Sequence, residues 1–328
     1  MNYLDRKWIM VEPTMTLGEG CPPPPLDSPW TNNSFIELTK YLQATKYNIQ
    51  SPNLVDAKAD VYFLISCIDH HLDLEIEFVK RVHREGSKVV LALSHDARFV
   101  GGHGLMQHDT YTIYTDLCRE VDVIWSGVPN DLHLYGSHQH KAIDAGDCIM
   151  KRNVFKGNYR DRPIDIISSG FTNEATLSFQ IVVYQMIKEK YPEKRLVYAF
   201  RPGQGYTDML NKVVPKFPEI EFTQHSFPEL LDASKVYMNM ELRPRGGRAT
   251  IEAWYHRVPS ISFSQTYFSK LFPQFSYDRL SFDKIVECYD RLLMSDYNEI
   301  IDYSEKVMEY DYFDMVYRRI INKLDEVK

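Results

Sequence analysis

The sequence has few of the features that assign a chain at once to a well-marked class of protein. Its five cysteines are odd in number and never form a CxxC pair, which disfavours a disulfide framework or zinc ribbon and favours a reducing cytoplasm. No apolar run approaches the roughly 20 residues that cross a bilayer, and the charged first residues predict no signal peptide. No GxGxxG motif follows the first apolar run, KWIMVEP, so a dinucleotide-dependent oxidoreductase is disfavoured.

The composition is that of a globular chain long enough for two domains. The 328 residues are 44% hydrophobic and 25% charged, which is ordinary for a protein with sizeable cores. A net charge of -7 argues against a nucleic-acid coat protein, although it leaves room for a local basic groove.

Apolar runs of strand length alternate with helix-length segments along most of the chain. Such alternation predicts parallel sheets with helices on both faces. The expected strands lie in residues 7–13, 59–68, 87–96, 121–127, 163–170, 194–200, 219–224, 235–242 and 258–264. The expected helices lie in residues 35–44, 72–86, 174–192, 207–217, 227–234 and 246–257, followed by a charged helical tail over about 282–328.

A basic segment without apolar periodicity, residues 151–163, interrupts the alternation and is the predicted linker. The predicted domains are therefore 1–155 and 156–305, each α/β and doubly wound, with a C-terminal helix over 306–328 that packs back on the first domain. The basic linker either contacts nucleic-acid phosphates or is simply solvated.

The segment ELRPRGGRATIEAWYHRVPSI, residues 241–261, concentrates positive charge in this acidic chain. A strand, a Gly246-Gly247 turn and a helix N-terminus offer backbone N–H groups and the positive end of a helix dipole to an anion. Arg243, Arg245 and Arg248 add donors suited to phosphate. The pattern predicts a diphosphate cradle, with a solvated helix start as the alternative.

This segment resembles the donor-binding segment of GT-B glycosyltransferases, in which a Gly-containing loop enters a helix with a Glu-Ala pair. Here Glu252-Ala253 and Pro259 follow the two glycines. The resemblance implies a GT-B fold, two Rossmann-like domains facing a central cleft with a helical C-terminal tail. It also implies that Glu252 holds the ribose and that Ala249 and Thr250 belong to the donor site. Pro244 stands where many retaining members carry a second Glu, which puts a sugar contact in doubt.

Three further residues are donor-site candidates on the same resemblance. Gly170 lies in the loop after the first expected strand of the second half, where small residues allow close backbone approach. Arg201 follows the next strand, and the backbone before Phe227 lies where related proteins contact the base. A capped helix start and plain turns are the alternatives.

His95, Asp96 and Arg98 follow an apolar strand of the first half. A carboxylate that emerges from apolar surroundings is suited to act as a general base. The Asp-x-Arg order resembles phage DNA β-glucosyltransferases, and this resemblance implies that Asp96 deprotonates the hydroxymethyl group of a modified cytosine. His95 is the competing base, and a helix cap or an Asp96–Arg98 ion pair is the structural alternative.

Two histidine-rich clusters, residues 68–73 and 101–109, lack the spacing of known metal motifs. We therefore predict no protein-bound metal and no tightly bound cofactor, and leave a divalent metal open.

The sequence thus predicts a cytoplasmic glycosyltransferase that uses a nucleotide-diphosphate sugar, with UDP-sugars favoured. Its predicted acceptor is a hydroxymethylated base in phage DNA, and no membrane contact is expected. A glycan or small-molecule acceptor and a non-catalytic sugar-nucleotide-binding protein are the alternatives. The sequence leaves the stereochemistry open, as it does the choice between a monomer and a small homo-oligomer.

Overall fold

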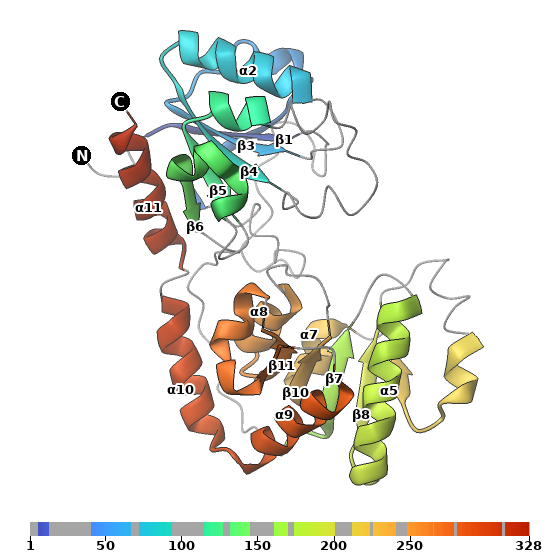
Figure 1. Cartoon of the computed structure of the whole chain (residues 1–328). Helices are drawn as coiled ribbons and strands as arrows, with labels where there is room; N and C mark the ends of the chain where they lie inside the picture. The colour runs from blue at the N-terminus through green and yellow to red at the C-terminus, as the bar shows by residue number, and fades with distance from the viewer. Residues whose placement is uncertain are drawn as a thin grey trace. The chain divides into compact units, whose positions relative to one another are not determined.

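The chain divides into two compact units, each built on its own parallel sheet (Figure 1). Unit 1 comprises Met1–Lys151 with Tyr310–Lys328, and unit 2 comprises Arg152–Glu309. The computed structural model describes residues 6–12, 41–66, 72–93, 115–126, 132–144, 161–169, 174–200, 212–223, 226–240, 248–264, 266–278, 281–309 and 312–327.

The described part of unit 1 contains a six-stranded sheet in the order β2-β1-β3-β4-β5-β6, with every neighbouring pair parallel. The chain leaves β1 first towards β2 and then towards β3, so the winding reverses between β1 and β3. The strands are β1 (Trp8–Glu12), β2 (Thr45–Asn48), β3 (Val61–Ser66), β4 (Lys88–Leu93), β5 (Val123–Ser126) and β6 (Ala142–Asp144).

Alternate residues of these strands enter two different cores, because successive side chains of a strand point to opposite faces. Ile9 and Leu64 pack on the face that helix α2 (Leu72–Arg84) covers. Trp8 and Phe63 pack on the other face. The described part of the unit also contains helical residues 115–120 and two 3₁₀ segments, η2 (Pro52–Leu54) and η3 (Leu132–Lys141).

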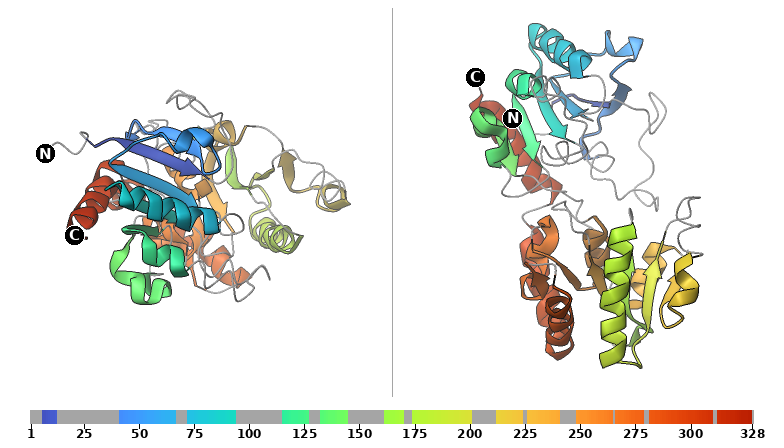
Figure 2. Two further views of the ribbon diagram at one scale, coloured as in Figure 1. Left: turned by 90° about the horizontal axis from the view of Figure 1, so that it is seen from above. Right: turned by 45° about the vertical axis from the view of Figure 1, so that its right-hand side comes forward.

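The second face of this sheet is covered by the end of the chain. Helix α11 (Phe313–Glu326) lies along the sheet in both views of Figure 2. It buries one apolar stripe in the same core as Trp8 and Phe63: Phe313, Val316, Tyr317, Ile320, Ile321 and Leu324. Two polar contacts attach the C-terminal end of α11 to the rest of the unit. Arg6 pairs with Asp325 at 2.7 Å, and Lys88 Nζ donates to the Val327 carbonyl at 3.1 Å. A parallel sheet needs both faces covered, and α11 provides that cover.

Unit 2 also contains a six-stranded parallel sheet in its described part, in the order β9-β8-β7-β10-β11-β12. Numbered from the first strand of the unit, this is the 3-2-1-4-5-6 order of dinucleotide-binding domains, and the winding reverses between β7 and β10. The strands are β7 (Ile164–Ser169), β8 (Leu196–Ala199), β9 (Glu221–Thr223), β10 (Ser234–Asn239), β11 (Ser260–Phe263) and β12 (Ser276–Tyr277).

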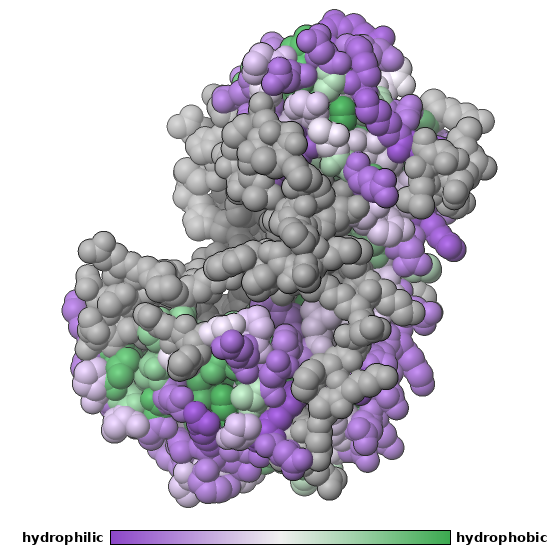
Figure 3. All heavy atoms as spheres, turned by 180° about the vertical axis from the view of Figure 1, so that it is seen from behind, coloured by the Kyte–Doolittle hydropathy of each residue, from purple (hydrophilic) through white to green (hydrophobic). Residues whose placement is uncertain are grey.

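Helices flank the unit 2 sheet. They are α5 (Glu174–Lys190), α7 (Phe227–Asp232), α8 (Arg248–Tyr255), α9 (Phe282–Met294) and α10 (Tyr297–Met308), with 3₁₀ segments η5 (Val214–Lys216), η6 (Tyr267–Leu271) and η7 (Pro273–Phe275). The described surface is mostly hydrophilic, with one hydrophobic area on unit 2 in the view of Figure 3. Among the described residues, no helix is long and apolar enough to cross a bilayer.

The predicted fold class is confirmed: both halves are α/β with parallel sheets, and the chain ends in helices. Three strands were not predicted. β2 (TKYN) is polar and partly exposed, β6 is three residues long and β12 is two residues long. All three lie at sheet edges, where neither length nor apolar character marks a strand.

We expect Ile320→Ala to destabilise unit 1 by about 3 kcal/mol, because Ile320 is fully buried beneath the sheet and the truncation leaves a cavity. Hydrogen exchange of the β1 and β3 amides measures the free energy of opening this unit. Asn322→Ala, on the exposed side of α11, is the matched control and should change this free energy of opening by less than about 0.5 kcal/mol. Equal effects of the two substitutions would contradict the role given to α11.

Candidate functional site

The carboxyl edge of the unit 2 sheet, at the reversal between β7 and β10, is the candidate site. In open α/β sheets, ligands bind outside the carboxyl ends of the strands where the winding reverses. Ser169 ends β7 and Asn239 ends β10. The two strands are also joined by a side-chain hydrogen bond of 3.2 Å between Ser169 Oγ and Tyr237 Oη. The end of β10 leads, after residues 241–247, into helix α8.

The start of α8 is fixed to the end of β10 by a buried polar contact. Asn239 Nδ2 donates to Thr250 Oγ1 at 2.9 Å, and both side chains are buried. Tyr277 Oη from β12 donates to the Asn239 carbonyl at 3.3 Å, which adds a second constraint on the same residue. The first turn of α8, whose backbone N–H groups have no partner within the helix, is therefore held at the carboxyl edge.

The rest of α8 is anchored by its apolar side. Ala253 is fully buried in the core beneath it, with Ala249 packed against the same core. Trp254 is buried on another side of the helix, and its Nε1 donates to Ser304 Oγ of α10 at 3.0 Å. Glu252 lies on the remaining, half-buried side.

The C-terminal end of α8 is closed by a defined turn. Arg257 has a positive φ of 52°, the Val258 N–H donates to the Ala253 carbonyl at 2.8 Å, and the Arg257 N–H donates to the Trp254 carbonyl at 2.9 Å. This is the Schellman pattern, which usually has Gly at the positive-φ position. Arg162 donates to the His256 carbonyl at 2.7 Å and to the Ser234 carbonyl at 2.8 Å.

The buried position of Arg162 corrects one expectation for the basic linker. Arg162 is 5% exposed and its guanidinium binds main-chain carbonyls of unit 2, so this residue is structural and does not face nucleic acid. The other basic residues of the linker, in 151–160, lie outside the described residues.

Phe227, the predicted base-side residue, begins helix α7 beside the same edge. Its ring meets the Tyr237 ring edge-on, with 5.8 Å between centroids. The Phe227 side chain therefore packs against the strand, and the backbone at the start of α7 lies beside the carboxyl edge.

Most predicted site residues lie outside the described residues. Described are Ala249, Thr250, Glu252 and Phe227, together with the backbone of Arg248 at the first position of α8. Outside lie His95, Asp96, Arg98, Gly170, Arg201, Arg243, Arg245, Gly246 and Gly247. The structure brings Thr250 to Asn239 and ties its hydroxyl there, so Thr250 contributes by holding the helix start.

The carboxyl edge of the unit 1 sheet carries two buried acids that the sequence did not single out. Glu12 ends β1 and pairs with Lys46 of β2 at 2.6 Å. Ser66 ends β3, and its hydroxyl donates to Glu75 Oε2 at 2.6 Å. Glu75 is fully buried in the first turn of α2, and its other carboxyl oxygen has no hydrogen-bond partner among the described residues. Burial raises the pKa of Glu75 to about 8, against the smaller opposing effect of the Ser66 hydrogen bond.

In the sequence, Glu75 belongs to an ordinary amphipathic helix pattern, so no local signal marks it. Only the tertiary contact with Ser66 shows that it is buried. No group of three or more His, Cys, Asp or Glu residues with metal-ligand geometry occurs among the described residues. Cys118 and Cys288 are buried thiols.

Comparisons with known proteins show the fold and no closer relationship. No family model matches the sequence, and no curated protein matches it. The GtfA/B complex is 13% identical with a TM-score of 0.61, over 84% of this chain and 59% of that one. The pneumococcal O-GlcNAc transferase GtfA, solved with UDP and GlcNAc, is 12% identical with a TM-score of 0.55, over 81% of this chain and 56% of that one.

A third similar structure is a Listeria monocytogenes protein named as a UDP-N-acetylglucosamine 2-epimerase. It is 9% identical with a TM-score of 0.53, over 96% of this chain and 95% of that one. This chain therefore spans under three-fifths of the two transferase chains but nearly all of the epimerase chain. At these identities the likeness establishes the fold: the chain has the GT-B fold seen in glycosyltransferases.

We expect the stability of unit 1 to fall as the pH rises from 5 to 8, because of Glu75. Between its ordinary pKa of 4.5 and its folded value of about 8, the folded unit keeps a proton that the unfolded chain has released. Linkage makes the loss between pH 5 and 8 about 3 to 4 kcal/mol. Glu75→Gln keeps an acceptor for Ser66 and cannot ionise, so relative to this variant the wild type should lose stability with rising pH.

Hydrogen exchange of the β3 and α2 amides at matched pH values measures the difference. Glu77→Gln, on the exposed side of α2, is the control and should follow the wild type. Parallel pH curves for wild type and Glu75→Gln would rule out a protonated Glu75.

Proposed function

We propose that this protein is a glycosyltransferase that moves a sugar from a nucleotide-diphosphate sugar, with UDP-sugars favoured, to a hydroxyl acceptor. The observation that carries the proposal is the position of α8, whose first turn is held by the Asn239–Thr250 bond at the winding reversal of unit 2. The solved structure of the pneumococcal O-GlcNAc transferase with UDP and GlcNAc, which shares the fold, supports UDP as the nucleotide.

The donor diphosphate would bind at the start of α8. The free N–H groups and positive dipole end of a helix favour an anion there. Arg243, Arg245 and Arg248 supply charge, and the Gly246-Gly247 turn allows the backbone to approach. Glu252, one turn into α8, would accept hydrogen bonds from the ribose hydroxyls. Gly170, Arg201 and the backbone at Phe227 complete the proposed donor site.

In the reaction, the bond between the anomeric carbon and the β-phosphate oxygen breaks, and the diphosphate leaves with the bonding electron pair. The acceptor oxygen bonds to the anomeric carbon and loses its proton to a base. We assign the base role to Asp96, with His95 as the competing base and Arg98 beside them. The cationic cradle stabilises the charge that grows on the leaving diphosphate, which is where preorganised electrostatics contribute most.

The proposed division of labour gives the acceptor to residues 1–155 and the donor to residues 156–305. Within the predicted C-terminal segment 306–328, helix α11 then serves the acceptor half by covering its sheet. For the acceptor we propose a hydroxymethylated DNA base, which the Asp-x-Arg segment supports. The alternative acceptor is a glycan or a small molecule, which the acidic net charge and the structural use of Arg162 support.

A second function, epimerisation of a UDP-amino sugar, is supported by the extent of one structural match. This chain matches the Listeria epimerase over almost the full length of both, whereas it spans under three-fifths of the transferases. Both functions need the same nucleotide site, so the donor-site proposal does not depend on which of them holds.

We expect Glu252→Gln to weaken UDP binding by about tenfold or more, because a hydrogen bond to a charged group contributes about 1.5–3 kcal/mol. Isothermal titration of UDP into the full chain measures the affinity. Glu219→Gln makes the same change at an exposed position of unit 2, before β9, and should leave the affinity unchanged. Equal affinities for wild type and Glu252→Gln would remove Glu252 from the ribose site.

Incubation with a panel of UDP- and GDP-sugars and hydroxymethylcytosine-containing DNA tests the reaction. We expect a hexose or N-acetylhexosamine mass gain on the modified nucleoside and none on plain DNA, with Asp96→Ala abolishing it. No mass gain with any donor would overturn the DNA acceptor. Conversion of the donor into its C2 epimer without transfer would establish the epimerase instead, and UDP binding with neither reaction would leave a sugar-nucleotide-binding protein.

A further inference from the structure

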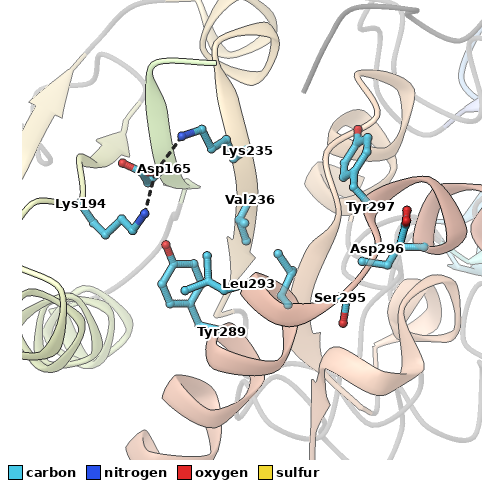
Figure 4. Close-up of a pocket in the computed structure, with 11 residues that line it drawn as sticks. Asp165, Lys194, Lys235, Val236, Tyr289, Leu293, Ser295, Asp296 and Tyr297 are labelled. Carbon is cyan, nitrogen blue, oxygen red and sulfur yellow. Dashed lines mark hydrogen bonds and ion pairs between the residues drawn. The ribbon is translucent and has the colours of Figure 1, made fainter. Parts of the chain in front are cut away.

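A pocket opens at the amino edge of the unit 2 sheet, the opposite edge from the candidate donor site. Its volume is about 250 Å³. Asp165 at the start of β7, Lys235 at the start of β10 and Lys194 just before β8 form one wall. The end of α9 and the start of α10 form the other. Figure 4 shows the two lysines reaching Asp165 from either side, with Tyr289 and Leu293 below them.

The first wall carries more positive than negative charge. Lys235 Nζ lies 3.1 Å and Lys194 Nζ 3.4 Å from the same oxygen, Asp165 Oδ1. The other oxygen of Asp165 accepts the Arg195 N–H at 3.0 Å. Two ammonium groups thus share one carboxylate, and both are partly exposed, at 28% and 22% of their side-chain surface.

Apart from Asp165, the nearby acids form no close ion pair with the two lysines among the described residues. Glu193 is 3.9 Å from Lys194 but is 66% exposed, so solvent screens that pair. Asp296 keeps its negative charge, but it lies on the opposite wall, where its Oδ1 accepts the Asn298 N–H at 2.8 Å as the cap of α10. Asp290, on α9, is paired with Lys190 and accepts from Tyr191 Oη. The ammonium N–H groups that Asp165 leaves over are therefore available to an anion.

The second wall is largely apolar, although Ser295, Asp296 and Tyr297 also belong to it. Tyr289, Leu292 and Ile300 are buried and line the pocket, whereas Leu293 lines it and is 42% exposed. The Tyr289 ring is held edge-on to the Tyr191 ring, with 5.9 Å between centroids. An exposed leucine beside a fixed aromatic ring and two lysines is a surface for a ligand with an apolar body and an anionic group.

We propose that this pocket is a second ligand site, for a small aromatic carboxylate. Its carboxylate would bind Lys194 and Lys235, and its ring would lie against Tyr289 and Leu293. The volume is just below the roughly 300–1,000 Å³ of sites for drug-sized ligands, which limits the ligand to one or two rings. The site lies at the amino edge, so it is separate from the proposed donor site and stands whether or not that proposal holds.

The test uses 1-naphthoate as the probe, titrated into the full chain and followed by its fluorescence. We expect saturable binding at a single site and about tenfold weaker binding of the neutral analogue 1-naphthalenemethanol. Leu293→Glu places a carboxylate in the pocket wall without touching the Asp165 network, and should weaken naphthoate binding about tenfold. Met294→Glu is the matched control, because Met294 is adjacent, 81% exposed and not part of the lining.

Leu293→Gln separates charge from lost apolar contact and should weaken naphthoate binding less than Leu293→Glu. Thermal unfolding confirms that each variant folds, and Lys235→Met replaces Leu293→Glu if that variant does not. Three results would overturn the proposal: no saturable binding at millimolar probe, equal effects at positions 293 and 294, or displacement of naphthoate by UDP. Displacement would assign the probe to the nucleotide site.

Discussion

The buried hydrogen bond between Asn239 and Thr250 is the contact on which the proposed chemistry of this protein depends. It joins the last residue of β10 to the first turn of α8 in a place without solvent, where breaking it would leave two polar groups unpaired. The helix start cannot move from the sheet edge while the bond is intact. Donors fixed in this way need no reorganisation when charge develops on a leaving group.

The same physical constraint determines where the candidate loops emerge in both units. A parallel sheet must be covered on both faces, so the loops of interest emerge only at its two edges. In unit 2, Trp254 and Ala253 bury α8 against α10 and the sheet. In unit 1 the cover on one face is α11, from the far end of the chain. One face of the unit 1 sheet is thus covered by a segment that follows the whole of unit 2 in the sequence.

The fold class was predictable because its signal is local. VYFLIS and KVVLAL are continuous apolar runs of strand length, and the helix between them, α2, has amphipathic periodicity. The edge strands β2, β6 and β12 were missed because short or polar strands carry no such signal. The cradle segment was visible for the same local reason, since its glycines and arginines are adjacent in sequence; its role in donor binding stays a prediction.

The other site features are tertiary and have no sequence signal. Thr250 and Asn239 are eleven residues apart and become a pair only when α8 folds onto β10. The burial of Glu75 against Ser66 follows from how α2 lies on its sheet. The amino-edge pocket joins Asp165 and Leu293, which are far apart in the chain. In each case the sequence around the residues is ordinary, and only their neighbours in the fold show that they belong to a site.

Hydrogen exchange of the full chain with and without UDP tests the central claim, that the start of α8 is a diphosphate site. A ligand that accepts hydrogen bonds from the first-turn N–H groups must slow their exchange with solvent. The account predicts that saturating UDP slows amide exchange within residues 241–252 and leaves the exchange of the α11 amides in unit 1 unchanged. Saturable binding of UDP with no protection in that segment would contradict it.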